Sequence, residues 1–224
     1  TGNRNVRIRK VTTADAEKML VYLRQVSDET PYMIRYPDEV RSSVEEERAF
    51  LEKITSGGRN FMLAALELNE DGLEGRIAGN VGVNAIGSTE KVCHRASLGI
   101  ALIQEYCGIG LGRILMEKSI ALASELGYTQ MELGVFENNE RALQLYRKMG
   151  FSEAGRIPNA FRLRTGEQIA EIQMVKGCQK CHPFFYVNNR QIPGSIFVRQ
   201  SRTKNDMISA EHIFVCKTYI SAMC

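Results

Sequence analysis

The sequence predicts a mixed α/β fold in which a central, mostly antiparallel sheet has helices on both of its faces. Short apolar runs of strand length alternate with segments whose apolar residues recur at helical spacing. Turn sequences at both ends of this pattern indicate antiparallel hairpins. Between the hairpins lies a single strand–helix–strand crossover, which indicates one parallel pair of strands. A sheet of mixed strand direction follows.

The first half of the chain contains one strand, two helices and three further strands. The expected elements are a strand at 6–8, helices at 14–26 and 44–54, and strands at 61–68, 76–86 and 95–103. Each helix is marked by a capping box, in which a hydroxyl and an acidic side chain stand three residues apart. Thr12 and Asp15 form the first box, and Ser43 and Glu46 form the second.

The second half continues with a helix, a strand, a helix and a final hairpin. The expected elements are a helix from 111 to 126, a strand at 128–136, a helix that follows Asn138-Asn139, and strands at 161–163 and 169–175. Gly127 and Gly150 are expected to end the two helices. The turn Arg164-Thr165-Gly166-Glu167 joins the last two strands. Residues 1–176 should therefore form one domain, and residues 177–224 an extension.

Composition and charge exclude several classes of protein. The main body carries 23 basic and 24 acidic residues, so it offers no general electrostatic attraction for nucleic acid. The extension is basic, with six Lys/Arg against two acidic residues. No stretch approaches the roughly 20 apolar residues that span a bilayer, and the first ten residues lack the apolar run of a signal peptide. We therefore expect no membrane or nucleic-acid partner, a cytoplasmic location and reduced thiols.

A glycine-rich turn lies between a predicted strand and a predicted helix, at Gly108-Ile109-Gly110-Leu111-Gly112. Glycines allow consecutive backbone N–H groups to converge on an anion, and the start of a helix adds partial positive charge. The turn therefore suits a pyrophosphate. A Walker loop is excluded because no Lys-Ser/Thr follows. A Rossmann site would place the turn near the start of its βαβ unit, with an acidic residue about 20 positions on; Glu132 is an unconvincing match.

At this point the sequence resembles the GNAT-superfamily N-acetyltransferases. The segment Tyr106 to Leu115 is similar to the acetyl-CoA pyrophosphate loop of that family. The segment Val135 to Phe151, with Asn139, Ala142 and Tyr146 at its centre, is similar to the last strand–helix element of the family. Both motifs occur in the family's order and spacing, and the resemblance covers about residues 5–176. It implies the family's fold and the use of acetyl-CoA as acetyl donor.

The resemblance also implies roles for individual residues. Backbone groups of Leu102 and Ile103 should pair with the pantetheine arm, which enters where two neighbouring parallel strands splay apart. The residues expected around the pyrophosphate are Cys107, Gly108, Ile109, Gly110, Leu111, Gly112 and Arg113. Asn139 and Ala142 should contact the cofactor from the next helix, and Tyr146 should lie near the thioester sulfur.

The expected reaction is direct attack by an amine on the thioester. A strand amide near Leu102 could hold the developing oxyanion, and Tyr146, with an ordinary pKa of about 10, could protonate the leaving thiolate. The general base is open, because Ser97 stands where related sequences often have Glu. His94 and Glu105 are alternatives, and a water chain or a neutral amine needs no base. Tyr146 could also be an ordinary core aromatic on the apolar face of its helix.

Cys107 is a second departure from the family, which usually has Gln, Arg or an aromatic residue there. A loop that binds through its backbone tolerates this change. The thiol has no apparent histidine partner, so we do not expect it to act as a nucleophile. The acceptor pocket is expected, by resemblance, between the irregular segment 28–40 and residues 158–164. Its lining candidates are Tyr32, Tyr36, Asn159 and Phe161; all four could equally be ordinary loop anchors.

The function expected from these observations is acetyl transfer from acetyl-CoA to a primary amine of a small molecule or a peptide, by a monomer or a homodimer. A non-catalytic acyl-CoA-binding regulatory domain is the alternative, and the loss of an acid at Ser97 favours it slightly. In the extension, Cys178, Cys181, His212 and Cys216 could bind zinc, although the gap between the pairs is long for a zinc finger. The C-x-x-C-H motif at 178–182 matches haem attachment only formally. A plain basic extension with strands at 184–187 and 196–198 is the third alternative.

Overall fold

The computed structural model describes residues 5–177 and 196–198. Its strands are β1 (Val6–Lys10), β2 (Phe61–Leu68), β3 (Glu74–Ala85), β4 (Arg95–Leu102), β5 (Gln130–Phe136), β6 (Ser152–Arg162), β7 (Gln168–Gly177) and β8 (Ile196–Val198). Its α-helices are α1 (Ala16–Glu29), α2 (Val44–Thr55), α3 (Leu111–Glu125) and α4 (Glu140–Lys148). Short 3-10 turns lie at Thr13–Asp15, Pro37–Glu39 and Gln104–Tyr106.

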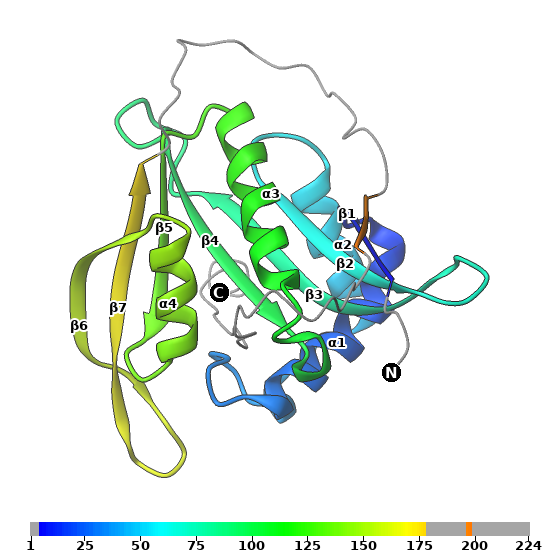
Figure 1. Ribbon diagram of the computed structural model, residues 1–224, viewed down its shortest axis with the longest axis horizontal. Helices are drawn as coiled ribbons and strands as arrows, with labels where there is room; N and C mark the ends of the chain where they lie inside the picture. Colours follow the sequence, from blue (N-terminus) through cyan, green and yellow to red (C-terminus); the bar gives the residue numbers. More distant parts are fainter. Residues whose placement is uncertain (1–4, 178–195, 199–224) are drawn as a thin grey trace, which may run out of the picture.

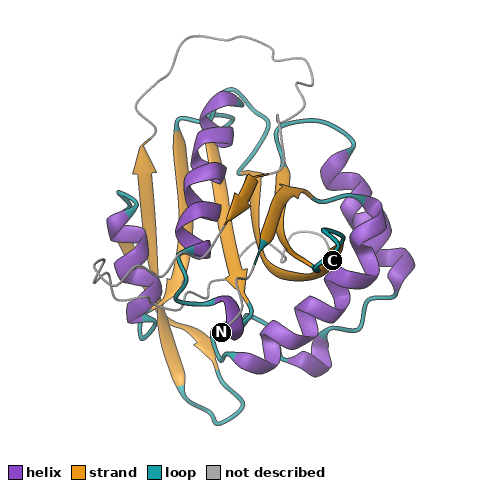
Figure 2. Ribbon diagram, turned by 45° about the vertical axis from the view of Figure 1, so that its right-hand side comes forward, coloured by secondary structure: helices purple, strands orange, loops and turns teal. Residues whose placement is uncertain are grey.

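The strands form one mixed sheet in the order β6-β7-β5-β4-β3-β2-β1-β8 (Figure 1). Among the described strands, only β4 and β5 run parallel; every other neighbouring pair is antiparallel. Helices α3 and α4 lie on one face of the sheet, and α1 and α2 lie on the other (Figures 1 and 2). The predicted fold class is therefore confirmed, including the single parallel crossover from β4 through α3 to β5.

The clearest difference from the expected elements is the length of β6. The sequence suggested a strand only at 161–163, but β6 begins at Ser152. Residues 152–160 are all exposed, so they carry no apolar alternation that could reveal a strand. A break in register between Ile157 and Phe161, with Asn159 at a φ of 53°, also interrupts the pairing with β7. Pairing with β7 therefore forms this strand, and the local sequence does not indicate it.

Part of the expected structure of the C-terminal extension lies within the described residues. Ile196–Val198 is a strand, as the sequence suggested, and it pairs antiparallel with β1. The strand expected at 184–187 lies outside the described residues, as do the proposed zinc ligands and the C-x-x-C-H motif. Among the described residues, no cluster of three or more His, Cys, Asp or Glu side chains could hold a metal ion, and no helix is long and apolar enough to cross a membrane.

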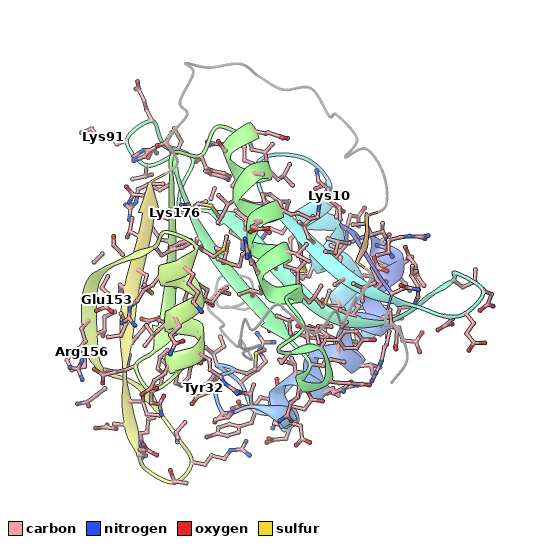
Figure 3. All side chains as sticks on the ribbon, in the orientation of Figure 1. Lys10, Tyr32, Lys91, Glu153, Arg156 and Lys176 are labelled. Carbon is pink, nitrogen blue, oxygen red and sulfur yellow. The ribbon has the colours of Figure 1, made fainter. Side chains whose placement is uncertain are left out.

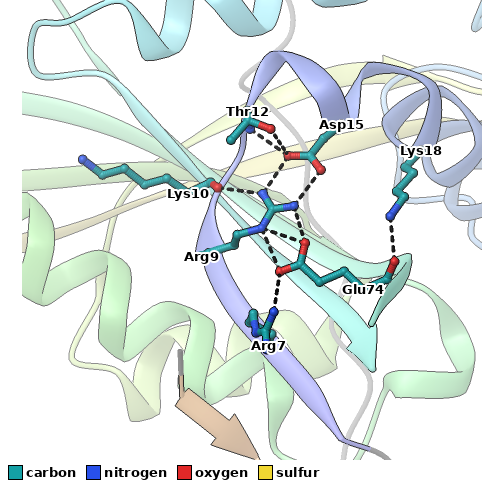
Figure 4. A network of polar contacts seen from close by, with 7 residues as sticks. All are labelled: Arg7, Arg9, Lys10, Thr12, Asp15, Lys18 and Glu74. Carbon is teal, nitrogen blue, oxygen red and sulfur yellow. Dashed lines mark hydrogen bonds and ion pairs between the residues drawn. The ribbon is translucent and has the colours of Figure 1, made fainter. Parts of the chain in front are cut away.

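An ion-pair network fixes the start of α1 against the sheet (Figure 4). Asp15 accepts hydrogen bonds from the backbone N–H and the hydroxyl of Thr12, in agreement with the expected capping box. Arg9 on β1 donates to both Asp15 oxygens, at 2.7 and 2.8 Å, and also to Glu74 on β3. Burial opposes ionisation of Asp15, but the bonds from Arg9 and Thr12 outweigh it and lower the pKa of that carboxyl. The second box is formed as well, between Ser43 and Glu46.

Helix α2 carries one carboxyl group on the stripe that faces the protein interior. Glu47 shares that stripe with Leu51 and Ile54, and only 5% of Glu47 is exposed. Burial raises the pKa of Glu47 from its ordinary value of 4.5 to about 7, and the positive charge of Arg35 opposes the rise only in part.

This raised pKa predicts a pH dependence of stability that Glu47→Gln removes. The folded protein binds more protons than the unfolded chain between pH 4.5 and about 7, so the carboxyl destabilises the fold increasingly across this range and remains unfavourable above it. We expect Glu47→Gln to be more stable than the wild type at pH 8, by about 1–3 kcal/mol, and no more stable at pH 4. Urea denaturation at both pH values measures this. Glu45→Gln, an exposed site on the same helical turn, is the control. Equal differences at the two pH values would contradict the prediction.

Candidate active site

The two parallel strands at the centre of the sheet separate after a short paired region. β4 and β5 are in register at only three positions, Arg95 with Gln130, Ala96 with Met131, and Ser97 with Glu132. Beyond Ser97 each strand pairs only on its outer side, β4 with β3 and β5 with β7. The strands visibly diverge from this point in Figure 1. The inner edges of 98–102 and 133–136 therefore face a gap in the sheet.

An ion pair closes the paired end of the gap. Arg95 donates to both carboxylate oxygens of Glu132, at 2.5 and 2.8 Å, and Gln130 donates to one of them. The hydrogen bonds from Arg95 lower the pKa of Glu132, with burial as a smaller opposing effect. Glu132 is thus a fixed anion that holds β5 to β4.

The backbone groups of β4 divide between its two neighbours. Ile103 donates its N–H to the carbonyl of Ala78 on β3, and its own carbonyl accepts the N–H of Tyr106. Both backbone groups of Ile103 therefore make hydrogen bonds within the fold, and its pairing with the pantetheine arm stays a prediction. Because neighbouring residues of a strand direct their backbone groups to opposite sides, those of Ile100 and Leu102 point toward β5. The backbone groups of Leu102 thus face the gap, and its pairing with the pantetheine arm stays a prediction.

The glycine-rich turn lies directly after this strand, at the open end of the gap. Gly108 and Gly110 have φ angles of 81° and 86°, which only glycine adopts readily. Gly110 is the residue before α3, and it offers no side chain to cap the helix. An α-helix does not use its own first N–H groups, so those of Leu111, Gly112 and Arg113 are directed out of the helix start. The first turn contains no acidic residue, so its positive electrostatic potential is retained.

The cysteine within this turn has a structural contact. Cys107 is buried, and its Sγ lies 3.5 Å from the carbonyl oxygen of Ile103. Ile109 is half-buried against the core. Arg113 is exposed and pairs with Glu117 one turn further along α3, at 2.7 Å. The thiol therefore stabilises the strand-to-helix turn, in keeping with a loop that acts through its backbone.

Helix α4 presents its expected residues on the face that packs against the sheet. Asn139 is buried and caps the helix, because its Oδ1 accepts the N–H of Ala142 at 3.2 Å. Ala142 and Tyr146 are fully buried one turn apart. The ring of Tyr146 meets that of Phe151 edge to face, with 6.0 Å between centroids. Asn139 thus has a clear architectural role, whatever else it contacts.

The two candidate bases, His94 and Glu105, and Ser97 at the family's usual acid position lie in segments that make other contacts. Ser97 donates to the Asn84 carbonyl at 3.4 Å and stands at the paired end of β4. His94 precedes that end, and its carbonyl accepts the N–H groups of Thr129 and Gln130. Glu105 is exposed and forms an ion pair with Arg76.

The two segments expected to frame the acceptor site do meet. Phe161 stacks on Phe136 with ring centroids 3.6 Å apart, and Tyr32 meets Phe136 edge to face at 5.6 Å. Tyr32 lies near the lower end of α4 in Figure 3, and its hydroxyl donates to the Asn138 carbonyl. Asn159 lies in the register break of β6, where its backbone has a φ of 53°.

A tie beside the aromatic cluster connects the α1–α2 segment to the β6–β7 hairpin. The Tyr36 hydroxyl accepts the N–H of Arg164 at 2.8 Å, and the Arg164 guanidinium lies 3.9 Å from the Tyr36 ring. The same guanidinium pairs with both oxygens of Asp38. Tyr36 therefore acts as an anchor of this tie, whereas Tyr32 and Phe161 belong to the aromatic cluster.

One residue of this region was missed from the sequence. Glu171 on β7 is only 2% exposed, and its carboxylate lies against Gly134 of β5. A Cβ at position 134 would fall 1.9 Å from Glu171 Oε1, so only glycine leaves room for the carboxylate. The available signal was a charged residue inside the apolar run Ile169-Ala170-Glu171-Ile172. Gly134, against which it packs, is distant in sequence, so the pattern could not show this contact.

A sheet that opens between two parallel strands above a glycine-rich helix start is characteristic of acyltransferases, and the comparisons with known proteins agree. A match to the acetyltransferase (GNAT) family covers residues 23–151. The structure of a GNAT-family acetyltransferase from Streptococcus pneumoniae is 30% identical, with a TM-score of 0.69, over 76% of this chain and 98% of that one. This chain therefore belongs to the GNAT acetyltransferase family.

More distant solved structures share the fold. Ribosomal-protein-alanine N-acetyltransferase from Brucella melitensis is 22% identical over 76% of this chain and 99% of that one, with a TM-score of 0.64. YncA from Salmonella typhimurium, solved with its cofactor acetyl-CoA, is 18% identical over 80% of this chain and 98% of that one, with a TM-score of 0.65. At these identities the likeness concerns the fold alone.

The cap at the start of α4 gives a prediction about stability. We expect Asn139→Ala to lower the free energy of unfolding by about 1 kcal/mol, because the N–H of Ala142 loses its acceptor. Asn139→Asp should keep most of this stability, since a carboxylate also caps. The neighbouring exposed residue provides the control: Asn138→Ala should change stability by no more than about 0.5 kcal/mol. Urea denaturation measures all three, and equal losses at 138 and 139 would argue against the cap.

Proposed function

We propose that this protein transfers the acetyl group of acetyl-CoA to a primary amine, which attacks the thioester directly while both substrates are bound. The observation that carries the proposal is the divergence of β4 and β5, with the glycine-rich start of α3 at its open end. The strand edges offer hydrogen-bonding groups to an extended amide-containing chain. The helix start offers N–H groups and positive potential to a pyrophosphate. Acetyl-CoA combines these two features in one molecule.

The residues present fit this donor. Backbone N–H groups from Gly108 to Arg113 would hold the pyrophosphate, with Gly110 leaving open space, since no atom lies within 4 Å of a Cβ placed there. Leu102 would pair with the pantetheine arm, and the backbone groups of Ile100 face the same side of the strand. Asn139 and Ala142 would contact the donor from the start of α4. The complex of YncA with acetyl-CoA supports this choice of donor.

When bound, acetyl-CoA supplies an activated acyl carbon and a thiolate leaving group. The fold contributes mainly by holding the two reactants together. The N–H of Leu102, directed toward the gap, would donate to the oxygen that becomes negative. Tyr146 would give its phenolic proton to the thiolate, whose basicity is comparable. The burial of Tyr146 against the sheet supports a fixed orientation for this transfer.

The charge of the pyrophosphate gives the first test. Asn and Asp have the same shape and both tolerate a positive φ better than other residues, so Gly110→Asn and Gly110→Asp differ mainly in charge. We expect Gly110→Asp to bind acetyl-CoA about tenfold or more weakly than Gly110→Asn, because its carboxylate faces the anion. Isothermal titration at low salt measures the difference, which should shrink as salt is raised. Equal affinities for the two variants would refute the placement of the pyrophosphate.

The proton donor gives the second test. Tyr146→Phe keeps the ring and its contact with Phe151 but removes the hydroxyl. We expect the turnover number to fall about a hundredfold, with acetyl-CoA affinity changed by no more than about twofold. A thiol-release assay measures turnover. Tyr128, another buried tyrosine, lies under Arg59 outside the site, and Tyr128→Phe should leave turnover unchanged. If Tyr146→Phe turns over at the wild-type rate, Tyr146 is not the acid.

Screening of acceptors separates an enzyme from a binding domain. The panel should contain small amines and peptides with a free N-terminus, since the Brucella relative is named for acetylation of a protein alanine. Thiol release with any of them establishes transfer. Tight binding of acetyl-CoA without turnover on the whole panel would instead favour the regulatory alternative, which Ser97 at the usual position of an acid also suggests.

A further inference from the structure

A buried carboxylate lies beside the open segment of β5. Glu171 packs against the backbone of Gly134, two positions beyond the last residue of β5 that pairs with β4. Gln173 on the same strand donates its side-chain amide to Glu171 Oε2, which orients the carboxylate. Gly134 makes this placement possible, because any side chain there would occupy the position of Oε1.

The carboxylate shares a face of the sheet with the aromatic cluster of Tyr32, Phe136 and Phe161. Glu171 and Phe136 are directly paired across β7 and β5, so their side chains emerge on the same face. Gly134 and Phe136 are two residues apart on β5 and therefore share that face as well. The anionic group and the aromatic wall are thus neighbours on one surface.

This surface is opposite to the one that carries α4. Figure 1 shows α4 in front of β5, on the same side as α3, whereas α1 and the segment that follows it lie on the other side. Tyr32 belongs to that segment, and its contact with Phe136 fixes the face to which Phe136 and Glu171 belong. A ligand held at Glu171 would therefore approach the gap from the face opposite to Tyr146.

We propose that Glu171 binds the ammonium group of the acceptor and takes its proton, and that the aromatic cluster holds the carbon skeleton beside it. This inference rests on the proposed acetyl transfer and names its acceptor class. A carboxylate selects a cation, and charge-assisted bonds are strongest where water is excluded. Aromatic rings select apolar or aromatic carbon and also favour a nearby cation. The acceptor is thus an aralkyl or apolar primary amine without an anionic group beside the nitrogen.

The proton balance of the step is complete with residues already named. The ammonium gives one proton to Glu171, and the neutral nitrogen forms a bond to the acyl carbon while the carbon–sulfur bond breaks. The thiolate takes a proton from Tyr146, and the nitrogen loses its second proton, which restores the Tyr146 phenol. Glu171 releases its proton to solvent with the product. The net reaction is ammonium plus thioester to amide, thiol and one proton.

A pair of matched probes tests the proposal through binding rather than turnover. 2-Phenylethylammonium and 2-phenylethanol share a skeleton and differ in charge, and both can be titrated calorimetrically in the presence of saturating coenzyme A. We expect the wild type to bind the ammonium at least about tenfold more tightly than the alcohol. Glu171→Gln should lose this preference, while its affinities for the alcohol and for acetyl-CoA stay within about twofold.

Two further variants make the readout specific. Glu167→Gln removes one negative charge from the exposed turn of the same hairpin and should keep the preference. Gly134→Ala should reduce the preference even though Glu171 is present, because the new methyl group displaces the carboxylate. If Glu171→Gln fails to fold, the same prediction is tested by comparing the preference for the ammonium in Gly134→Ala with that in the wild type.

The outcomes separate this proposal from the proposed function. Equal affinity of the wild type for the two probes, or an undiminished preference in Glu171→Gln, would overturn the role of Glu171 while acetyl-CoA binding stayed intact. Loss of acetyl-CoA affinity in Glu171→Gln equal to its loss of ammonium affinity would also overturn it, since that result indicates a structural role. Failure of the wild type to bind acetyl-CoA would instead refute the acetyltransferase proposal itself.

Discussion

The early end of the pairing between β4 and β5 is the constraint on which the site depends. Two parallel strands in the middle of a sheet would normally continue side by side, because each then satisfies the backbone groups of the other. Here the ladder ends after Ser97 and Glu132, and the remaining residues are held only from outside by β3 and β7. The Arg95–Glu132 pair keeps the closed end together. The sheet therefore has a fixed opening within an otherwise continuous ladder.

The elements around this opening follow from the chain direction. Because β4 and β5 are parallel, their C-terminal ends lie at the same end of the gap, and the segments that leave them must begin there. The Gly108–Gly112 turn starts α3 from one strand, and Asn139 starts α4 from the other. Both helices therefore direct their N-terminal ends toward the opening, where their partial positive charges add. A single break in pairing thus brings two helix starts and two strand edges together.

The local structures that the sequence predicted correctly are those encoded by short patterns. The glycine turn, the Asn139 cap and the Ser43–Glu46 box each involve residues within five positions of one another, so their spacing identifies them. β6 was largely missed because its exposed residues form a strand only through pairing with β7. The engagement of Ile103 depends on Ala78, and that of Glu171 on Gly134, so neither could be read locally.

Strand β5 has a different task on each face. Its alternate residues Gly134 and Phe136 support the face of Glu171 and the aromatic cluster, whereas Leu133 and Val135 point to the face covered by α4. Substitution at Gly134 therefore acts on the face of Glu171, and the strand itself separates that face from the helix with Tyr146. Because a β-sheet is a single layer of strands, groups on its two faces lie close to each other at the opening between β4 and β5. The alternation of side chains along β5 separates the two faces, and the divergence of β5 from β4 makes the opening between them.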